Sequence, residues 1–196
     1  MLVFSKAKLV FLSVPKTGTT AYEKALGPQA SITVLDPPEL KHAPIYRYNR
    51  FMRPMLEKFV DPGIETMAVV REPISWMSSW YRYRHRPFLQ DTPTSTQGIS
   101  FDDFVLAYMK GKKPDFANVG SQAKFLEPQP NGTALTHLFR YENQPRLIEF
   151  LESRLEIKLE LARENVSPEM DLHLSPDVEA RFRNKCSEEF DLWESG

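Results

Sequence analysis

The sequence predicts a single α/β domain over residues 1–196, a three-layer sandwich with helices on both faces of a central, mostly parallel sheet of four to five strands. Two observations support this prediction. Short apolar runs typical of buried strands alternate with longer segments typical of helices, and this alternation favours parallel strands joined by helices. The chain is also 41% apolar and 26% charged, so it can bury a core and is not a disordered tail.

Four apolar runs are candidate strands. Residues 9–14 (LVFLSV) are interrupted only by Ser13, as expected for a strand buried on both faces. Residues 32–35 (ITVL) end at two prolines, residues 66–70 (TMAVV) form a third run, and residues 137–141 (HLFRY) form a weaker fourth.

Five segments have helix signals. A proline opens residues 73–84, where the missing amide is not needed, and Ser100 can cap the next helix by accepting a free amide of its first turn. The predicted helices are 20–26, 73–84, 100–110, 144–155 and a last one that begins at Ser175-Pro176. Residues 86–100 form a long loop, which we expect to be a mobile substrate loop that closes over an acceptor.

Charge and cysteine content restrict the function classes. Lys plus Arg number 25 and Asp plus Glu 26, a net charge of −1, which argues against general nucleic-acid or membrane-surface binding. Residues 1–14 lack a long apolar span, so we expect neither a signal peptide nor a membrane span. The single cysteine cannot form an internal disulfide, which suits a reducing, cytoplasmic setting. The four histidines are scattered along the chain and the cysteine stands alone, so the sequence suggests no metal site.

The stretch LVFLSVPKTGTT (9–20) predicts an anion-binding loop, because an apolar strand stops and small donors follow at the start of a helix. Lys16 adds a full positive charge, and Gly18 lets the backbone approach a ligand closely. Three hydroxyls can donate to anionic oxygens, those of Thr17, Thr19 and Thr20.

The loop does not fit a magnesium nucleotide. In the common nucleoside-triphosphate loop, G-x-x-x-x-G-K-[ST], the lysine follows the second glycine, whereas Lys16 comes two residues before Gly18. Val10 and Pro15 occupy the places of that motif's glycines, and the third strand ends in Arg71 instead of a magnesium-binding aspartate.

Two motifs resemble the sulfotransferases that use 3′-phosphoadenosine 5′-phosphosulfate (PAPS). VPKTGTT resembles the 5′-phosphosulfate loop of that family. REPISWMSSWY resembles its second motif, an arginine that ends a strand, then R-x-P, a serine eight residues on and an aromatic two later; Arg71, Pro73, Ser79 and Tyr81 match it. The similarity covers roughly residues 8–85, with fainter echoes in LFRYEN (138–143) and ENVSP (164–168).

The resemblance implies a P-loop NTPase-like sulfotransferase fold, PAPS as sulfuryl donor, its product adenosine 3′,5′-bisphosphate (PAP), and no required metal. Arg71, a fixed fork of donors, and Ser79 would hold the 3′-phosphate. Lys16 would neutralise charge on the leaving oxygens as a catalytic residue. The residues implied in donor binding are Lys16, Thr17, Gly18, Thr19, Thr20, Arg71 and Ser79.

A hydroxyl acceptor must lose a proton, and the resemblance favours His42 as the base, with Lys41 beside it. Glu23 is an alternative base, although it can equally face solvent. His137 and His173 are expected to be structural.

The acceptor is expected to be a small molecule or a saccharide that offers a hydroxyl or an amine. The aromatic and basic stretch at residues 76–86 includes arginines that could attract an anionic acceptor. Candidate acceptor contacts are Lys41, Arg84, His85 and Gln122, and Asn165 with Ser167 are weaker ones.

Two other functions stay open at this point. A divergent magnesium-dependent nucleotide kinase would share the loop physics, but the position of Lys16 and the arginine at position 71 disfavour it. A non-catalytic nucleotide-binding protein of the same fold is the other alternative.

Overall fold

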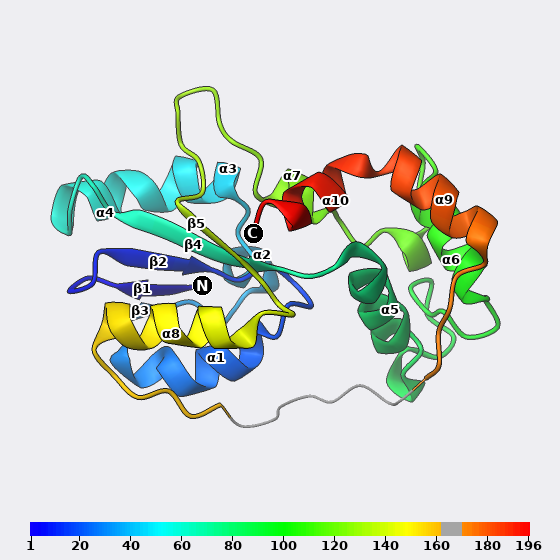
Figure 1. Ribbon diagram of the computed structural model, residues 1–196, viewed down its shortest axis with the longest axis horizontal. Coiled ribbons are helices and arrows are strands. Elements are labelled where there is room, and N and C mark those ends of the chain that lie inside the picture. The colour runs from blue at the N-terminus through cyan, green and yellow to red at the C-terminus, as the bar shows by residue number, and fades with distance from the viewer. Residues whose placement is uncertain (162–169) are drawn as a thin grey trace.

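The computed structural model describes residues 1–161 and 170–196 (Figure 1). Asn165 and Ser167 lie outside the described residues. The strands are β1 (Leu2–Phe4), β2 (Leu9–Leu12), β3 (Ile32–Thr33), β4 (Glu65–Val70) and β5 (His137–Arg140). The α-helices are α1 (Thr19–Leu26), α2 (Pro38–Lys41), α3 (Ile45–Arg47), α4 (Arg53–Phe59), α5 (Pro73–Arg84), α6 (Phe101–Tyr108), α7 (Gln122–Phe125), α8 (Gln144–Leu155), α9 (Pro176–Lys185) and α10 (Ser187–Glu194). Tyr48–Met52 form a π-helical turn (η2), and the short 3₁₀ helices are η1 (Gly27–Gln29), η3 (Pro87–Leu89) and η4 (Asp115–Ala117).

The five strands form one mixed sheet in the order β3-β1-β2-β4-β5. The predicted α/β class with four to five strands is confirmed, but only the half formed by β2, β4 and β5 is parallel. β1 is antiparallel to both β2 and β3. A tight turn explains the difference, since Lys8 has a left-handed backbone (φ 50°) and its amide donates to the Ser5 carbonyl at 3.2 Å. β1 therefore runs back directly alongside β2.

Local signals placed most elements. α5 and α8 have the predicted bounds, and the Ser100 side chain accepts from the Asp103 amide at the start of α6. The predicted strand at 32–35 pairs only over its first two residues, at the sheet edge. The predicted last helix is two helices, α9 and α10, which meet at Cys186.

Helices cover both faces of the sheet (Figure 1). On one face α1 and α8 bury Leu26 and Leu147 against strand residues such as Met67. On the other face α3, η2 and α4 bury Ile45 and Leu56 against the alternate residues of β2 and β4. The three-layer arrangement follows from this alternation, because successive strand residues point to opposite faces.

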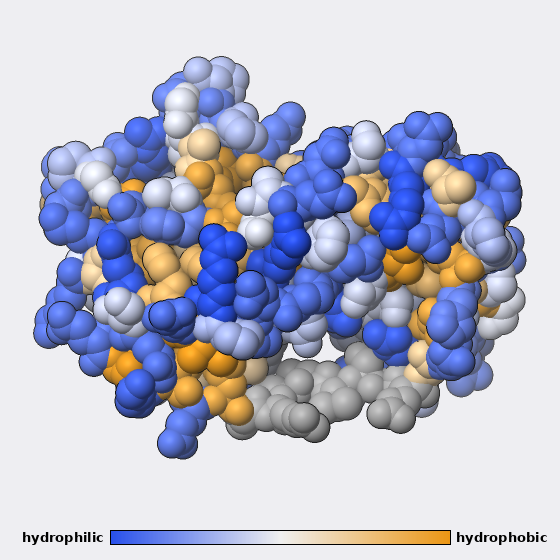
Figure 2. Space-filling view, viewed as in Figure 1, coloured by the Kyte–Doolittle hydropathy of each residue, from blue (hydrophilic) through white to orange (hydrophobic). Residues whose placement is uncertain are grey.

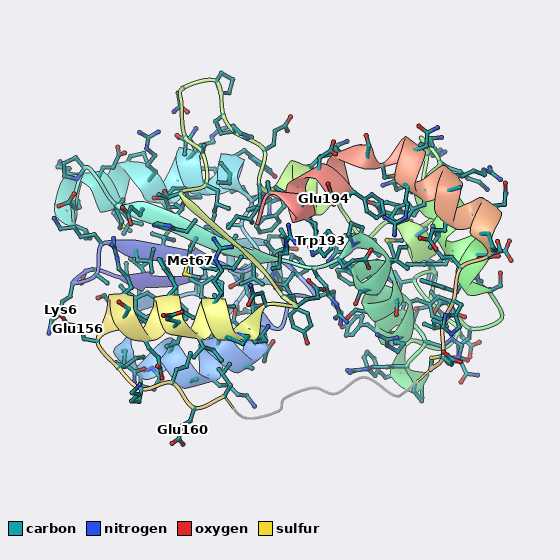
Figure 3. All side chains as sticks on the ribbon, in the orientation of Figure 1. Lys6, Met67, Glu156, Glu160, Trp193 and Glu194 are labelled. Atoms are coloured by element: carbon teal, nitrogen blue, oxygen red, sulfur yellow. The ribbon has the colours of Figure 1, made fainter. Side chains whose placement is uncertain are left out.

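A third apolar cluster builds a helical lobe beside the end of the sheet, from α5, α6 and α9 (Figure 1). α10 connects this lobe to the edge strand β5: Arg140 Nε donates to the Trp193 carbonyl at 2.8 Å, and its guanidinium lies 4.6 Å from the Trp193 ring centroid. Figure 3 labels Trp193 and Glu194 at that end of α10. Figure 2 shows strongly hydrophilic residues gathered between the sheet and the lobe.

Residues 86–100 are tied to α5 at several points. Thr96 is buried, and its hydroxyl donates to the Tyr81 carbonyl at 2.9 Å. The side-chain Nε2 of Gln97 donates to the His85 carbonyl at 3.3 Å.

Among the described residues no helix is long and apolar enough to cross a lipid bilayer.

Candidate functional site

The loop between β2 and α1 is held in an unusual backbone shape. Lys16 (φ 66°) and Gly18 (φ 76°) both have left-handed conformations, and Lys16 has to bear strain that a glycine would not. The Thr17 hydroxyl donates to the Val14 carbonyl at 2.9 Å, so this side chain closes the loop on itself. The predicted role of Thr17 as a hydroxyl donor to an anion therefore conflicts with the bond it makes here.

The other donors of the loop are unused. Among the described residues, the amides of residues 16–20 have no hydrogen-bond acceptor, and neither do the hydroxyls of Thr19 and Thr20. Free amides at a helix start carry partial positive charge and suit an anion. The predicted donors, except the Thr17 hydroxyl, are thus available at one place.

Tyr141 joins the two sequence motifs. A Cβ on Gly18 would lie 2.9 Å from Tyr141 Cε2, so the aromatic ring leaves room only for glycine at this position. The Arg71 guanidinium lies 4.6 Å from the centroid of the same ring, and Arg71 Nε donates to Ser75 Oγ at 2.8 Å. Arg71 and the loop between β2 and α1 therefore both contact the Tyr141 ring.

Lys16 points toward the aromatic side of α5. Its Nζ lies 4.3 Å from the Tyr83 ring centroid and 5.6 Å from that of Trp80. Burial, together with the positive charges of Arg86, Arg71 and Arg82, lowers the pKa of Lys16 to about 8. The three arginines therefore lie close enough to the half-buried ammonium group of Lys16 to disfavour its charge.

Among the described residues these cations form no salt bridge, although Glu142 and Glu72 lie near enough to Arg71 to raise its pKa against the effect of burial. No carboxylate of the described residues lies within 4.0 Å of Lys16, Arg71, Arg82 or Arg86. Arg82 instead donates to Ser78 Oγ at 2.6 Å, and burial lowers its pKa. A cluster of four unpaired cations is an arrangement that an anionic ligand with several charges would stabilise.

Ser79 and Gln122 differ in whether their polar side-chain atoms already make hydrogen bonds. Ser79 is buried on α5, one turn after Ser75, and its hydroxyl makes no hydrogen bond with the described residues. Gln122 is 1% exposed and holds the end of β4: its Oε1 accepts from the Arg71 amide and its Nε2 donates to the Arg71 carbonyl, both at 2.9 Å. The predicted acceptor contact of Gln122 stays a prediction, and the role seen here is to position Arg71 through both of its polar atoms.

His42 lies at the end of α2 and contacts Ser13, just before the loop between β2 and α1. Its Nδ1 is 2.7 Å from the Ser13 carbonyl, which can only accept, so Nδ1 carries the proton and Nε2 has the lone pair. Burial lowers the pKa of His42, which favours the neutral ring. A cavity of about 580 Å³ opens beside His42 and Pro15. The arrangement suits a base whose Nε2 lone pair is available.

Lys41, next to His42 in the chain, forms an ion pair with the buried Glu23. Lys41 Nζ lies 2.7 Å from Glu23 Oε2, and Ser13 Oγ donates to Glu23 Oε1 at 2.9 Å. Glu23 is 6% exposed, so the alternative that it faces solvent is wrong. The predicted acceptor contact of Lys41 stays a prediction, and the contact seen here is the ion pair with Glu23.

Arg84 and His85 belong to the helical lobe. Arg84 donates to the carbonyls of Asp115 and, at 3.0 Å, Asn118. His85 stacks on Tyr81 with ring centroids 5.7 Å apart, and its Nδ1 is buried without a partner among the described residues. The predicted acceptor contacts of both residues stay predictions; in the structure Arg84 holds the ends of η4 and His85 packs on Tyr81 of α5.

Sequence reasoning missed the role of Arg82 and Arg86 beside Lys16, and it missed Tyr141 and Ser75. One signal was available for Arg82, because Ser78 and Arg82 are four residues apart and so share one side of α5, whereas Arg86 lies two residues beyond the end of that helix. Tyr141 could not be found in this way, since its contact with Gly18 joins segments far apart in the chain.

Comparison of the chain with protein-family models, with curated proteins and with solved structures gave no match. Within residues 1–161 and 170–196, no group of three or more His, Cys, Asp or Glu side chains is arranged to hold a metal ion.

The strain and charge at Lys16 lead to a stability prediction. Lys16→Met should raise the unfolding free energy of the ligand-free protein at pH 7 by roughly 1–3 kcal/mol, because the buried ammonium group is removed while its apolar stem is kept. The pKa in the folded state, about 8, is below the ordinary 10.5, so the folded protein loses this proton first. The gain should therefore shrink as pH rises from about 8 to 10.5.

Urea unfolding of wild type and variant at pH 7 and pH 10 measures this gain. Lys8→Met is a matched control, because Lys8 also has a left-handed backbone (φ 50°) but is ion-paired with Asp61 at 2.6 Å. We expect no gain in that variant. A Lys16→Met protein less stable than wild type at pH 7 would contradict the electrostatic interpretation.

Proposed function

We propose that this protein is a PAPS-dependent sulfotransferase that moves a sulfuryl group to a hydroxyl acceptor. The observation that carries the proposal is the unpaired cation cluster of Lys16, Arg71, Arg82 and Arg86 around the free amides of the β2–α1 loop. A donor with phosphates at two separated positions matches such a cluster better than a single small anion does. The finer fold proposal is a P-loop NTPase-like sulfotransferase fold, supported by the parallel order β2-β4-β5 and by the loop at the end of β2.

Donor binding would use both ends of the cluster. The amides of residues 16–20 and the Thr19 and Thr20 hydroxyls would hold the 5′-phosphate. Arg71 would grip the 3′-phosphate through the edge of its guanidinium that Ser75 leaves free, and the Ser79 hydroxyl would add one donor. Gln122 fixes the Arg71 backbone, so that this grip is positioned before the nucleotide arrives.

Transfer would then follow an in-line path. The acceptor oxygen attacks the sulfur, and the bond between sulfur and the 5′-phosphate oxygen breaks, which leaves PAP with the electron pair of that bond. Lys16 neutralises the charge that grows on the leaving oxygen, which requires its ammonium group to turn from the Tyr83 ring toward the phosphosulfate. His42 Nε2 takes the acceptor proton, and the Ser13 carbonyl holds the resulting imidazolium through Nδ1. Positioning and electrostatics supply the rate.

A thermal-shift experiment tests the proposal against both alternatives. PAP without metal should raise the melting temperature, because a ligand that binds only the folded protein stabilises it by mass action, and ATP with magnesium should not. The magnesium-dependent kinase predicts the reverse pattern. Sulfate transfer from PAPS to any hydroxyl compound would then separate the sulfotransferase from a non-catalytic nucleotide-binding protein. A protein that PAP leaves unshifted at millimolar concentration has no site of the proposed kind.

A further inference from the structure

The cavity of about 580 Å³ lies between the loop, His42 and the helical lobe. Its size is in the range of sites for small organic molecules. Two of its walls are aromatic, Trp76 and Tyr108, whose ring centroids are 6.4 Å apart. The Trp76 indole N–H donates to the Pro15 carbonyl at 2.9 Å, so this wall is fixed to the proposed donor loop. Both side chains are buried and contribute apolar atoms to the cavity wall next to the proposed base.

Two lysines from different elements also line the cavity. Lys113 follows α6, with its Nζ 3.6 Å from the Tyr108 ring centroid, and Lys124 lies on α7. Neither has a carboxylate within 4.0 Å among the described residues. Burial lowers the pKa of Lys113, and the nearby charge of Lys124 lowers it further. Glu188 lines the cavity as well, and both Glu188 and the buried Glu189 act on the pKa of Lys113 in the opposite direction to Lys124.

These lysines are distinct from the cation cluster of the proposed donor site. Lys16, Arg71, Arg82 and Arg86 do not line the cavity, whereas His42 and Pro15 do. A second positive region on the acceptor side of the loop needs a different anionic partner. The aromatic walls next to it indicate that the partner also has an apolar or ring-shaped part.

We propose that the cavity binds the acceptor, and that the acceptor is a ring-bearing hydroxyl compound with a carboxylate. The carboxylate lies against Lys113 and Lys124, the ring against Trp76 and Tyr108, and the hydroxyl reaches His42 Nε2. The assignment of this molecule as acceptor rests on the proposed sulfotransferase function; the selection of a carboxylate by the cavity does not.

Matched pairs of probes test the selection. Calorimetry would compare 4-hydroxybenzoate and 4-hydroxyphenylacetate with their methyl esters, and D-glucuronate with D-glucose, each added to protein saturated with PAP and to protein without it. In at least one pair we expect the acid to bind tenfold or more tightly. If no acid binds better than its neutral partner in either form of the protein, the proposal is overturned.

Variants assign the preference to the lysines. Lys113→Gln and Lys124→Gln should each reduce the ratio of acid to neutral affinity about tenfold, while Lys112→Gln should leave it unchanged, since Lys112 is exposed and does not line the cavity. The neutral partners should bind all three variants like wild type, which shows that the cavity is intact. Equal loss for acid and neutral probe would mean that the lysines only support the fold, and it too would overturn the proposal.

The result is independent of the donor. If PAP fails to bind but the acid is still selected through Lys113 and Lys124, the sulfotransferase proposal is wrong and the carboxylate site stands. If PAP binds and no acid is preferred, the carboxylate site is wrong and the sulfotransferase proposal stands.

Discussion

Replacing His42 by alanine is expected to lower the turnover number for sulfuryl transfer by about 10²–10⁴-fold and to leave the affinity for PAP within about twofold. The reason is the hydrogen bond from Nδ1 to the Ser13 carbonyl, which leaves the lone pair of Nε2 as the proton acceptor. His42 lines the cavity of the proposed acceptor and lies apart from the cation cluster, so its loss removes the base without removing a donor contact.

The pH profile of kcat/KM gives a second measurement of the same role. The pKa of His42 is below its ordinary 6.5 because of burial, so the wild-type profile should decrease only at a pH below that value, as the base takes a proton. Lys16 has to be charged, and its pKa of about 8 should produce a decrease on the alkaline side. In His42→Ala the acid-side decrease should disappear and the alkaline one should remain.

His173→Ala is the matched control, because the His173 side chain is 82% exposed and its partner is the equally exposed Asp171. We expect wild-type turnover from this variant. Wild-type turnover from His42→Ala, with stability unchanged, would exclude His42 as the base.

Sequence reasoning predicted elements whose signals are local. The apolar run before Pro15 and the one that ends at Arg71 are strands for the expected reason, burial on both faces. The antiparallel β1 was not placed, since its pairing depends on a turn at Lys8 that no glycine or proline marks. A strand of three residues with a two-residue edge partner has too little sequence to specify its direction.

The candidate site was predictable to a similar extent. Lys16, Gly18 and Arg71 lie in motifs that follow the ends of β2 and β4. Because these neighbouring strands are parallel, topology alone brings the three residues to the same end of the sheet, at the carboxyl ends of the strands. Side-chain partners depend on tertiary contacts and could not be predicted. Gln122 was expected to contact the acceptor but holds the Arg71 backbone, and Lys41 was expected beside the base but pairs with buried Glu23.

Replacing Arg71 by alanine is expected to weaken PAP binding by about 10²–10³-fold and the binding of adenosine 5′-monophosphate by no more than about threefold. The difference arises because only PAP has a 3′-phosphate, and a guanidinium can make two charge-assisted hydrogen bonds to it. A loss of 10²–10³ in affinity corresponds to about 2.7–4.1 kcal/mol, close to the lower end of what two such bonds contribute, about 1.5–3 kcal/mol each. Isothermal titration of both nucleotides against wild type and variant measures the two losses.

The ligand-free protein provides the decisive comparison. Burial lowers the pKa of Arg71, which means that its charge is held in place at a cost in stability. Arg71→Ala also removes the hydrogen bond to Ser75 and the contact with the Tyr141 ring, so urea unfolding of the ligand-free variant is needed to separate lost affinity from a damaged fold. Arg50→Ala, which removes an exposed arginine from η2, should bind both nucleotides normally. If Arg71→Ala weakened both nucleotides equally, Arg71 would hold the 5′-phosphate instead, and the two-ended grip on the donor would have to be abandoned.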